Sequence, residues 1–161
     1  EIYTLSLHDA LPISFDSAPV GGRDTTLWPD HCVAGTAGAG FHSGLDPRPY
    51  RLIVRKGTRT GLDSYSAFFE NDGSTPTGLD GFLRGIGAST VYIAGLALDY
   101  CVYYSALDAA RLGYHVWLVI DATRPVVPCG PGGQPAAPVA AALEDLRSRG
   151  VAIINSAEVV R

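Results

Sequence analysis

The sequence predicts an α/β fold, with a parallel β-sheet and helices packed on its faces. Its length of 161 residues suits one domain with a real core. Apolar residues make up 47% of the chain and charged residues only 17%, a balance typical of a folded protein with a buried sheet. From Tyr50 onward, strand-like apolar runs alternate with helical patterns, as repeated βαβ units do.

Four runs are predicted to be strands of this sheet. They are rich in β-branched residues and almost continuously apolar, which is typical of parallel strands buried on both faces. They cover residues 51–55, 90–95, 115–120 and 151–154.

Three helices are predicted between and after these strands, because apolar residues recur at helical spacing. The residues that carry the spacing are Leu79, Phe82, Leu83 and Ile86, then Val102, Leu107, Ala110 and Leu112, then Val139, Leu143 and Leu146. Gly85, Gly113 and Gly150 stand where a helix C-terminus favours a positive φ, and Pro138 suits the first turn of the last helix.

Two stretches do not follow this alternation of strands and helices. Residues 125–138 are rich in Pro and Gly and are predicted to form a surface loop of unassigned function. Residues 1–14 (EIYTLSLHDALPIS) have no cap and no clear period, and they resemble a translated sequencing adapter. We interpret 1–14 as non-native and 15–161 as a single domain that is incomplete at its N-terminus; the alternative is a genuine, divergent N-terminal arm.

Charge and hydropathy exclude several classes of partner. The net charge is −4 and Lys and Arg form no basic stripe, which argues against binding to nucleic acid or an anionic membrane. No apolar run reaches the roughly 18 residues of a membrane span, and no basic region precedes an apolar stretch. The sequence therefore predicts a cytoplasmic protein with a small-molecule partner, and leaves its oligomeric state open.

Cys101 is the first candidate for chemistry. It follows the predicted strand 90–95 and falls in the first turn of a helix, where N–H groups and the helix dipole stabilise a thiolate and can bind an oxyanion. Lys56 follows the predicted strand 51–55, so both residues are expected at the carboxyl edge of the sheet, where α/β proteins bind ligands. The alternatives are a buried apolar cysteine, the commoner fate of a lone Cys, and a solvated lysine.

Four motifs, in order, give the chain a family resemblance. They are WPDHCV at 28–33, VRKG at 54–57, DSYSAFF at 63–69 and GLALDYCV at 95–102. From about Phe15 to the C-terminus the chain resembles the nicotinamidases of the isochorismatase-like hydrolase family. The resemblance implies a three-layer α/β/α sandwich whose first strand is missing here.

The resemblance also implies a chemistry, in which an Asp, Lys and Cys triad hydrolyses nicotinamide to nicotinate and ammonia through a thioester for NAD salvage. Cys101 would be the nucleophile and Lys56 the triad lysine. The Leu96–Ala97 peptide would be cis, with the N–H groups of Ala97 and Cys101 directed at the oxyanion.

The same resemblance places aromatic residues around the substrate. Trp28 and Tyr65 would line the pyridine pocket, with core packing as the alternative for both. Tyr100, which precedes the nucleophile, is assigned either to the pocket or to packing. For Phe68 and Phe69 we favour core packing.

Other family positions are not matched. The strand motif D-x-Q-x-D-F, whose first Asp is the general base, is absent, and neither Asp9 nor Asp16 stands in its context. Family members bind a divalent metal, zinc or iron or else manganese, and only His31 of the metal ligands remains in its motif. One histidine does not hold a divalent ion against water, so we expect this chain to bind the metal poorly and to have uncertain activity.

Three alternatives stay open. A near relative could hydrolyse another small amide, a carbamoyl group or a vinyl ether. A non-catalytic member could bind a pyridine ligand or a partner, as the absent base would allow. The lowest-ranked hypothesis is a structural zinc site of Cys32, Cys101 and Cys129 with His31, whose spacings form no paired C-x-x-C units.

Overall fold

The computed structural model describes residues 17–20, 22–46, 48–59, 61–126 and 137–159. By its internal contacts the chain divides into two compact units, Glu1–Asp63 and Ser64–Arg161, called here the first and second units. Some predicted features lie outside the described residues: the segment 1–14, Asp9, Asp16, Cys129 and most of the loop 125–138. A single domain over 15–161 stays a prediction.

The second unit is built on a parallel sheet. Strands β3 (Thr90–Leu96), β4 (His115–Arg124) and β5 (Ala152–Ile154) pair in the order β3-β4-β5, and both pairings are parallel. Strands at all three positions were predicted, and β4 continues four residues beyond its predicted end. Parallel neighbours need a crossover between them, and the intervening helices supply it. The predicted α/β class is confirmed.

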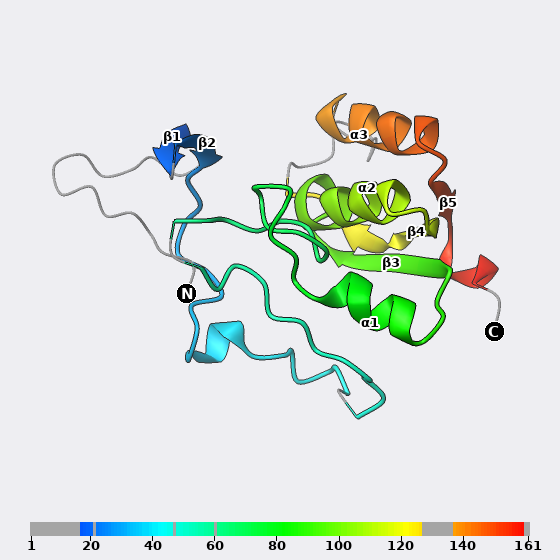
Figure 1. Ribbon diagram of the computed structural model, residues 1–161, viewed down its shortest axis with the longest axis horizontal. Coiled ribbons are helices and arrows are strands. Elements are labelled where there is room, and N and C mark those ends of the chain that lie inside the picture. The colour runs from blue at the N-terminus through cyan, green and yellow to red at the C-terminus, as the bar shows by residue number, and fades with distance from the viewer. Residues whose placement is uncertain (1–16, 21, 47, 60, 127–136, 160–161) are drawn as a thin grey trace, which may run out of the picture. The chain divides into compact units, whose positions relative to one another are not determined.

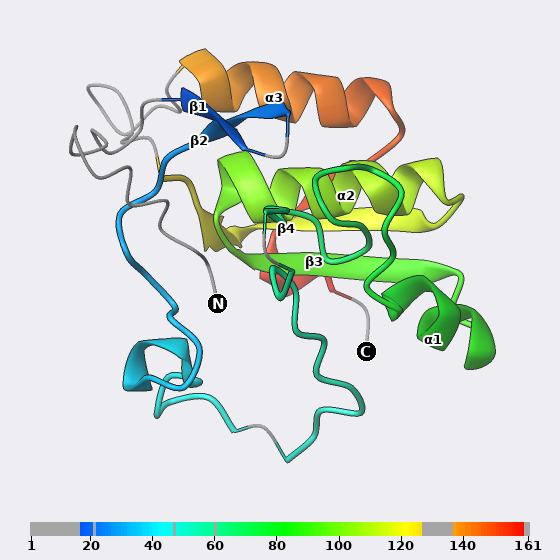
Figure 2. The ribbon, with the colours of Figure 1, turned by 60° about the vertical axis from the view of Figure 1, so that its left-hand side comes forward.

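Three helices accompany this sheet. Helices α2 (Tyr103–Arg111) and α3 (Ala137–Ser148) pack on each other and on one face of the sheet (Figures 1 and 2). Helix α1 (Leu79–Gly85) lies beside β3, on the side away from α2 in both views. The periodic apolar residues of the sequence therefore do mark helices.

Glycines end the helices, with one correction. Gly113 has φ 88° and Gly150 has φ 83°, as predicted for residues that follow a helix. Gly85 is instead the last residue of α1, and the positive φ belongs to Gly87 at 72°. The positive φ comes two residues later than predicted because Ile86, the last apolar residue of the predicted helix, is the C-cap residue of α1, and the chain turns only after it. Pro138 is the second residue of α3, within its first turn.

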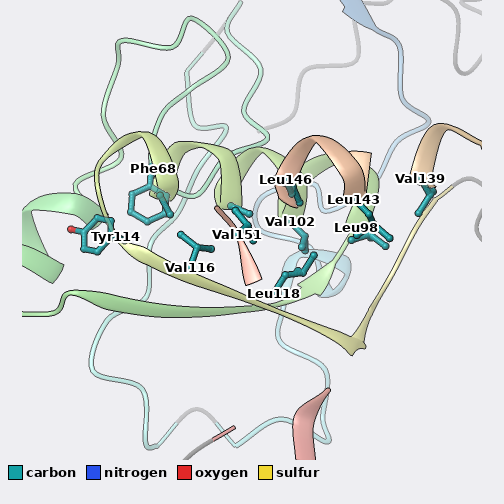
Figure 3. Packing of buried hydrophobic residues seen from close by; sticks show 12 residues of the cluster. Phe68, Leu98, Val102, Tyr114, Val116, Leu118, Val139, Leu143, Leu146 and Val151 are labelled. Atoms are coloured by element: carbon teal, nitrogen blue, oxygen red, sulfur yellow. The ribbon is translucent and has the colours of Figure 1, made fainter. Parts of the chain in front are cut away.

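The core of the second unit lies between the sheet and the helices α2 and α3 (Figure 3). Leu118 of β4 and Leu146 of α3 are both 0% exposed. Burying a leucine side chain stabilises a fold by about 1.5–3 kcal/mol, so these layers hold the unit together. The members of the core that Figure 3 labels are Phe68, Leu98, Val102, Tyr114, Val116, Leu118, Val139, Leu143, Leu146 and Val151.

Two strand predictions were wrong in part. No residue of β3 is buried, although burial on both faces was expected, because β3 is an edge strand of the described sheet. Residues 51–55 form no strand, and Leu52 and Ile53 are 40% and 48% exposed. A strand requires a partner for its backbone groups, and no described strand pairs with this run.

The first unit contains little regular structure. Strands β1 (Ser17–Val20) and β2 (Arg23–Thr26) form an antiparallel hairpin, and a short 3₁₀ helix follows at Ala37–Ala39. Neither element was predicted. None of the side chains described from 24 to 63 is buried. Across the described ranges of the chain, no helix has the length and apolar character that a membrane span needs.

Candidate active site

Cys101 lies on the segment that joins β3 to α2. Residues Leu98–Val102 form one turn of π-helix, which continues directly into α2. The Ala97 carbonyl accepts hydrogen bonds from the N–H groups of Tyr100 (3.1 Å) and Val102 (3.0 Å). Cys101 is therefore held in the first turn of a helical segment after the carboxyl end of β3, and its side chain is partly exposed.

The peptide between Leu96 and Ala97 is cis. This confirms the geometry that the family resemblance implied. Gly95 precedes it with φ 107°, in the region that favours glycine, where the pairing register of β3 with β4 shifts. The oxyanion role of the Ala97 and Cys101 N–H groups stays a prediction.

A cluster of tyrosines lies next to this turn. The Tyr65 ring meets the Tyr100 ring edge to face, with centroids 5.4 Å apart, and stacks on the Tyr104 ring, also at 5.4 Å. Such aromatic pairs contribute about 0.5–1.5 kcal/mol each beyond the area they bury. Of the predicted site residues, the structure thus brings Tyr65 and Tyr100 together on the Cys101 turn.

Burial raises the pKa of Tyr100, and the negative charge of Asp99 raises this pKa further. Tyr100 is therefore a neutral phenol at neutral pH, able to donate a hydrogen bond. Asp99 has a second contact, because its Oδ1 accepts the Val126 N–H at 2.9 Å. This bond ties the segment after β4 to the turn that carries Cys101.

Two residues of this cluster were missed from the sequence. Tyr104 stands four residues after Tyr100, a spacing that puts both rings on one helix face and was available as a signal. Asn71 accepts the Tyr65 N–H with its Oδ1 at 2.8 Å. No sequence pattern indicates this contact, since it depends on how the loop turns back on itself.

The remaining predicted residues, Trp28, His31 and Lys56, belong to the first unit. The rings of Trp28 and His31 meet edge to face with centroids 6.3 Å apart, and His31 Nδ1 lies 2.7 Å from the Pro29 carbonyl oxygen. Lys56 was predicted to lie at the edge of the sheet because it follows the predicted strand 51–55. Residues 51–55 form no strand, so this reason for its placement does not hold. The roles of these three residues stay predictions.

No metal site is formed by the part of the chain that the structure describes. Within the described ranges, no three His, Cys, Asp or Glu side chains come together as a metal site requires. His31 has one ring nitrogen next to a carbonyl oxygen, and no second candidate ligand joins it in such a group. These residues alone do not fit a divalent ion, and we derive no chemical step through one.

Comparisons with known proteins agree with this arrangement. The isochorismatase domain model matches residues 2–158. The nicotinamidase of Acinetobacter baylyi is 45% identical over 112 residues, which cover 70% of this chain and 52% of that protein. The chain thus spans about half the length of this relative.

Solved structures of nicotinamidases and pyrazinamidases are also similar to this chain. The nicotinamidase and pyrazinamidase of Acinetobacter baumanii superimposes with a TM-score of 0.84 at 33% identity, over 99% of this chain and 72% of that one. The pyrazinamidase of Pyrococcus horikoshii, solved in complex with zinc, has a TM-score of 0.66 at 35% identity, over 81% of this chain and 64% of that one. The chain belongs to the isochorismatase domain family.

Proposed function

We propose that this protein is a nicotinamidase, which hydrolyses nicotinamide to nicotinate and ammonia. The observation that carries the proposal is the Cys101 turn after β3, whose Tyr100 ring meets the ring of Tyr65. The nicotinamidases among its relatives support the same activity. A partly exposed thiol beside aromatic rings suits a reaction in which a flat heteroaromatic amide is held while a nucleophile attacks it.

The reaction would proceed in two steps. The Cys101 thiolate attacks the carboxamide carbon, and the N–H groups of Ala97 and Cys101 stabilise the resulting oxyanion. The C–N bond then breaks, ammonia leaves with the proton that the thiol gave up, and a thioester remains on Cys101. Water attacks the thioester, which releases nicotinate and restores the thiol.

Other residues of this chain would support these steps. The positive charge of Lys56 would stabilise the thiolate, and the rings of Tyr65 and Trp28 would bind the pyridine, with Tyr100 beside them. In a complete family member a divalent metal would have His31 among its ligands, whereas the described residues of this chain alone do not form such a site. Participation in NAD salvage and a cytoplasmic location complete the proposal.

The test is hydrolysis of nicotinamide by the purified chain and by two cysteine variants. Cys101→Ala is expected to abolish release of ammonia, whereas Cys32→Ala, which changes the other exposed or partly exposed free thiol of the described residues, leaves it unchanged. With Cys101→Ser, a slow residual rate is expected because the hydroxyl is a much weaker nucleophile. Equal activity of Cys101→Ala and the unchanged chain would rule out the mechanism.

A second candidate is a pyridine-binding protein without turnover. The ring cluster of Tyr65 and Tyr100 favours it, because aromatic side chains can bind a flat heteroaromatic ligand whether or not it reacts. Under this function, the chain binds nicotinamide without releasing ammonia, and Tyr65→Ala weakens the binding. Calorimetric titration with nicotinamide, run beside the ammonia assay, separates the two candidates.

A further inference from the structure

Ser105 connects the Cys101 turn to the loop that carries Tyr65. It lies one helical turn after Cys101, on α2, and is only 7% exposed. Its Oγ donates a hydrogen bond to the Cys101 carbonyl at 2.5 Å. The same oxygen accepts the N–H of Ala67 at 2.8 Å. A hydroxyl can donate once and accept, so Ser105 forms both kinds of bond at once.

The loop that Ser105 holds is fixed by further short contacts. Ser66 Oγ accepts the Phe68 N–H at 3.0 Å, and Thr77 Oγ1 donates to the Ala67 carbonyl at 2.6 Å. Phe68 and Ser66 are both buried, with 3% and 4% of their surface exposed. The segment around Ala67 is therefore held by several short bonds, and the bond to Ser105 is the one among these that connects it to α2.

Tyr65 stands two residues before Ala67 in this piece. Its N–H is held by Asn71 and its ring stacks on Tyr104, the neighbour of Ser105 on α2. Two consecutive residues of α2 thus hold the Tyr65 segment, Tyr104 through its ring and Ser105 through one hydrogen bond. The carbonyl that Ser105 binds belongs to the proposed nucleophile itself.

We infer that Ser105 is a positioning residue, which sets the place of the Tyr65 ring relative to Cys101. The inference rests on the proposed function, because it assigns Tyr65 to substrate binding. Serines inside helices often bind the carbonyl four residues earlier, and alone that contact has no functional meaning. The second bond, to a residue 38 positions away, distinguishes Ser105 from such a serine.

Ser148 supplies a matched control. Its Oγ also donates to a backbone carbonyl of its own helix, that of Asp145, at 2.7 Å. It lies at the end of α3 and is exposed, so it shares the local contact of Ser105 without the burial. Comparing variants at the two positions therefore distinguishes the effect of removing any helix hydroxyl from the effect of removing the hydrogen bond to Ala67.

The experiment measures kcat and KM for nicotinamide in the full chain and in Ser105→Ala, Ser105→Thr and Ser148→Ala. Ser105→Ala leaves the Ala67 N–H without its acceptor, and we expect KM to rise roughly tenfold while kcat per folded molecule changes less than about twofold. Ser105→Thr keeps the hydroxyl and is expected to restore KM. Ser148→Ala is expected to leave both constants unchanged. A fall in kcat that follows the folded fraction, with KM unchanged, would overturn the inference.

A second readout does not depend on turnover. Alkylation by iodoacetamide is followed at Cys101 and at the exposed Cys32 by peptide mass spectrometry, and the ratio of the two rates is compared. In Ser105→Ala we expect the ratio of the Cys101 rate to the Cys32 rate to rise severalfold, because the Cys101 turn loosens. In Ser105→Thr we expect this ratio to return to the value of the unchanged chain. If the unchanged chain releases no ammonia, the proposed function fails, and this ratio alone decides about Ser105. An equal ratio in the unchanged chain and in Ser105→Ala contradicts its positioning role.

Discussion

The two units of the chain differ in how their side chains are held. The second unit has a core in which Leu118, Leu146 and Val139 are almost completely buried. In the first unit, none of the side chains described from 24 to 63 is buried, and the regular structure of its described residues is one hairpin and a 3₁₀ turn. Family motifs occur in both units, so a recognisable motif does not by itself imply a packed environment.

This difference bears directly on the proposed site. Cys101, Tyr65 and Tyr100 are positioned by a helix, a loop and ring contacts that rest on a buried core. Lys56 and His31 belong to the first unit, where none of the side chains described from 24 to 63 is buried. Groups of an active site need to be fixed by their surroundings, and for Cys101, Tyr65 and Tyr100 the core of the second unit supplies that support.

The largest expected effect comes from matched leucine substitutions in the two units. Leu118→Ala removes a side chain that is 0% exposed and is expected to lower the free energy of unfolding by about 2–5 kcal/mol. Leu52→Ala removes one that is 40% exposed, with an expected change within about 0.5 kcal/mol. Urea unfolding followed by far-UV circular dichroism measures both. Similar losses in the two variants would mean that the first unit has a core of its own.

A smaller effect is expected at the contact between α2 and α3. Tyr103 donates a hydrogen bond from its hydroxyl to Asp145 Oδ2 at 2.8 Å. Burial, and then this bond, raise the pKa of Tyr103 to about 12. A raised folded-state pKa stabilises the fold fully below the unfolded value of about 10, and this contribution is lost as pH rises through the folded value.

Tyr103→Phe is therefore expected to be less stable at neutral pH and to lose less stability on the alkaline side. Urea midpoints of both proteins at about pH 8 and about pH 11 measure this difference, and absorbance of the phenolate checks the titration. Phe68→Leu, a change in the same core that keeps Tyr103, is the control. If both proteins lose equal stability between the two pH values, Tyr103 is not the titrating group.

The same contrast shows what the sequence can predict. The strands at 90–95, 115–120 and 151–154 were predicted correctly because their apolar pattern and their pairing agree. Residues 51–55 have the same pattern, yet they form no strand. The apolar pattern of a segment indicates which of its side chains can be buried. Whether the segment pairs as a strand depends on partners far away in the chain.

The candidate site was predictable where the signal was local. The turn with Cys101 followed from the strand-to-helix pattern, and the family resemblance implied the cis Leu96–Ala97 peptide. The π-helical turn at Leu98–Val102 did not, since apolar periodicity does not distinguish a π turn from an α turn. The role of Ser105 was also missed, because it requires the contact with Ala67.

A weaker effect is expected where β4 meets the last turn of the chain. Asp121 accepts hydrogen bonds from the Ser156 N–H at 2.7 Å and the Ser156 hydroxyl at 2.6 Å. These bonds lower the pKa of Asp121, the hydroxyl having the larger effect. The stability that Asp121 contributes is thus present above its unfolded-state pKa of about 3.9, and it is lost as pH falls from there through the lower folded-state pKa. Asp121→Asn is expected to be slightly less stable than the unchanged chain at about pH 6, and this difference is expected to narrow as pH falls towards about 2, as measured by thermal unfolding.

The smallest effect is expected for two ion pairs of similar length, one in each unit. Arg48 and Asp46 lie 2.7 Å apart in the first unit, and Arg149 and Asp145 lie 2.9 Å apart in the second. The Arg48 side chain is 88% exposed and that of Arg149 is 52% exposed. Water screens exposed pairs, so Arg48→Ala is expected to leave the unfolding midpoint unchanged.

Arg149→Ala is expected to produce a small but measurable loss of stability, because Asp145 also accepts the Tyr103 hydroxyl and so links α3 to α2. The loss should shrink at high salt, since screening already weakens the pair in the unchanged chain. Thermal melts at low and high salt measure both variants side by side. Equal and salt-independent losses would show that the exposed pair of the first unit is held as firmly as the pair that rests on packed helices.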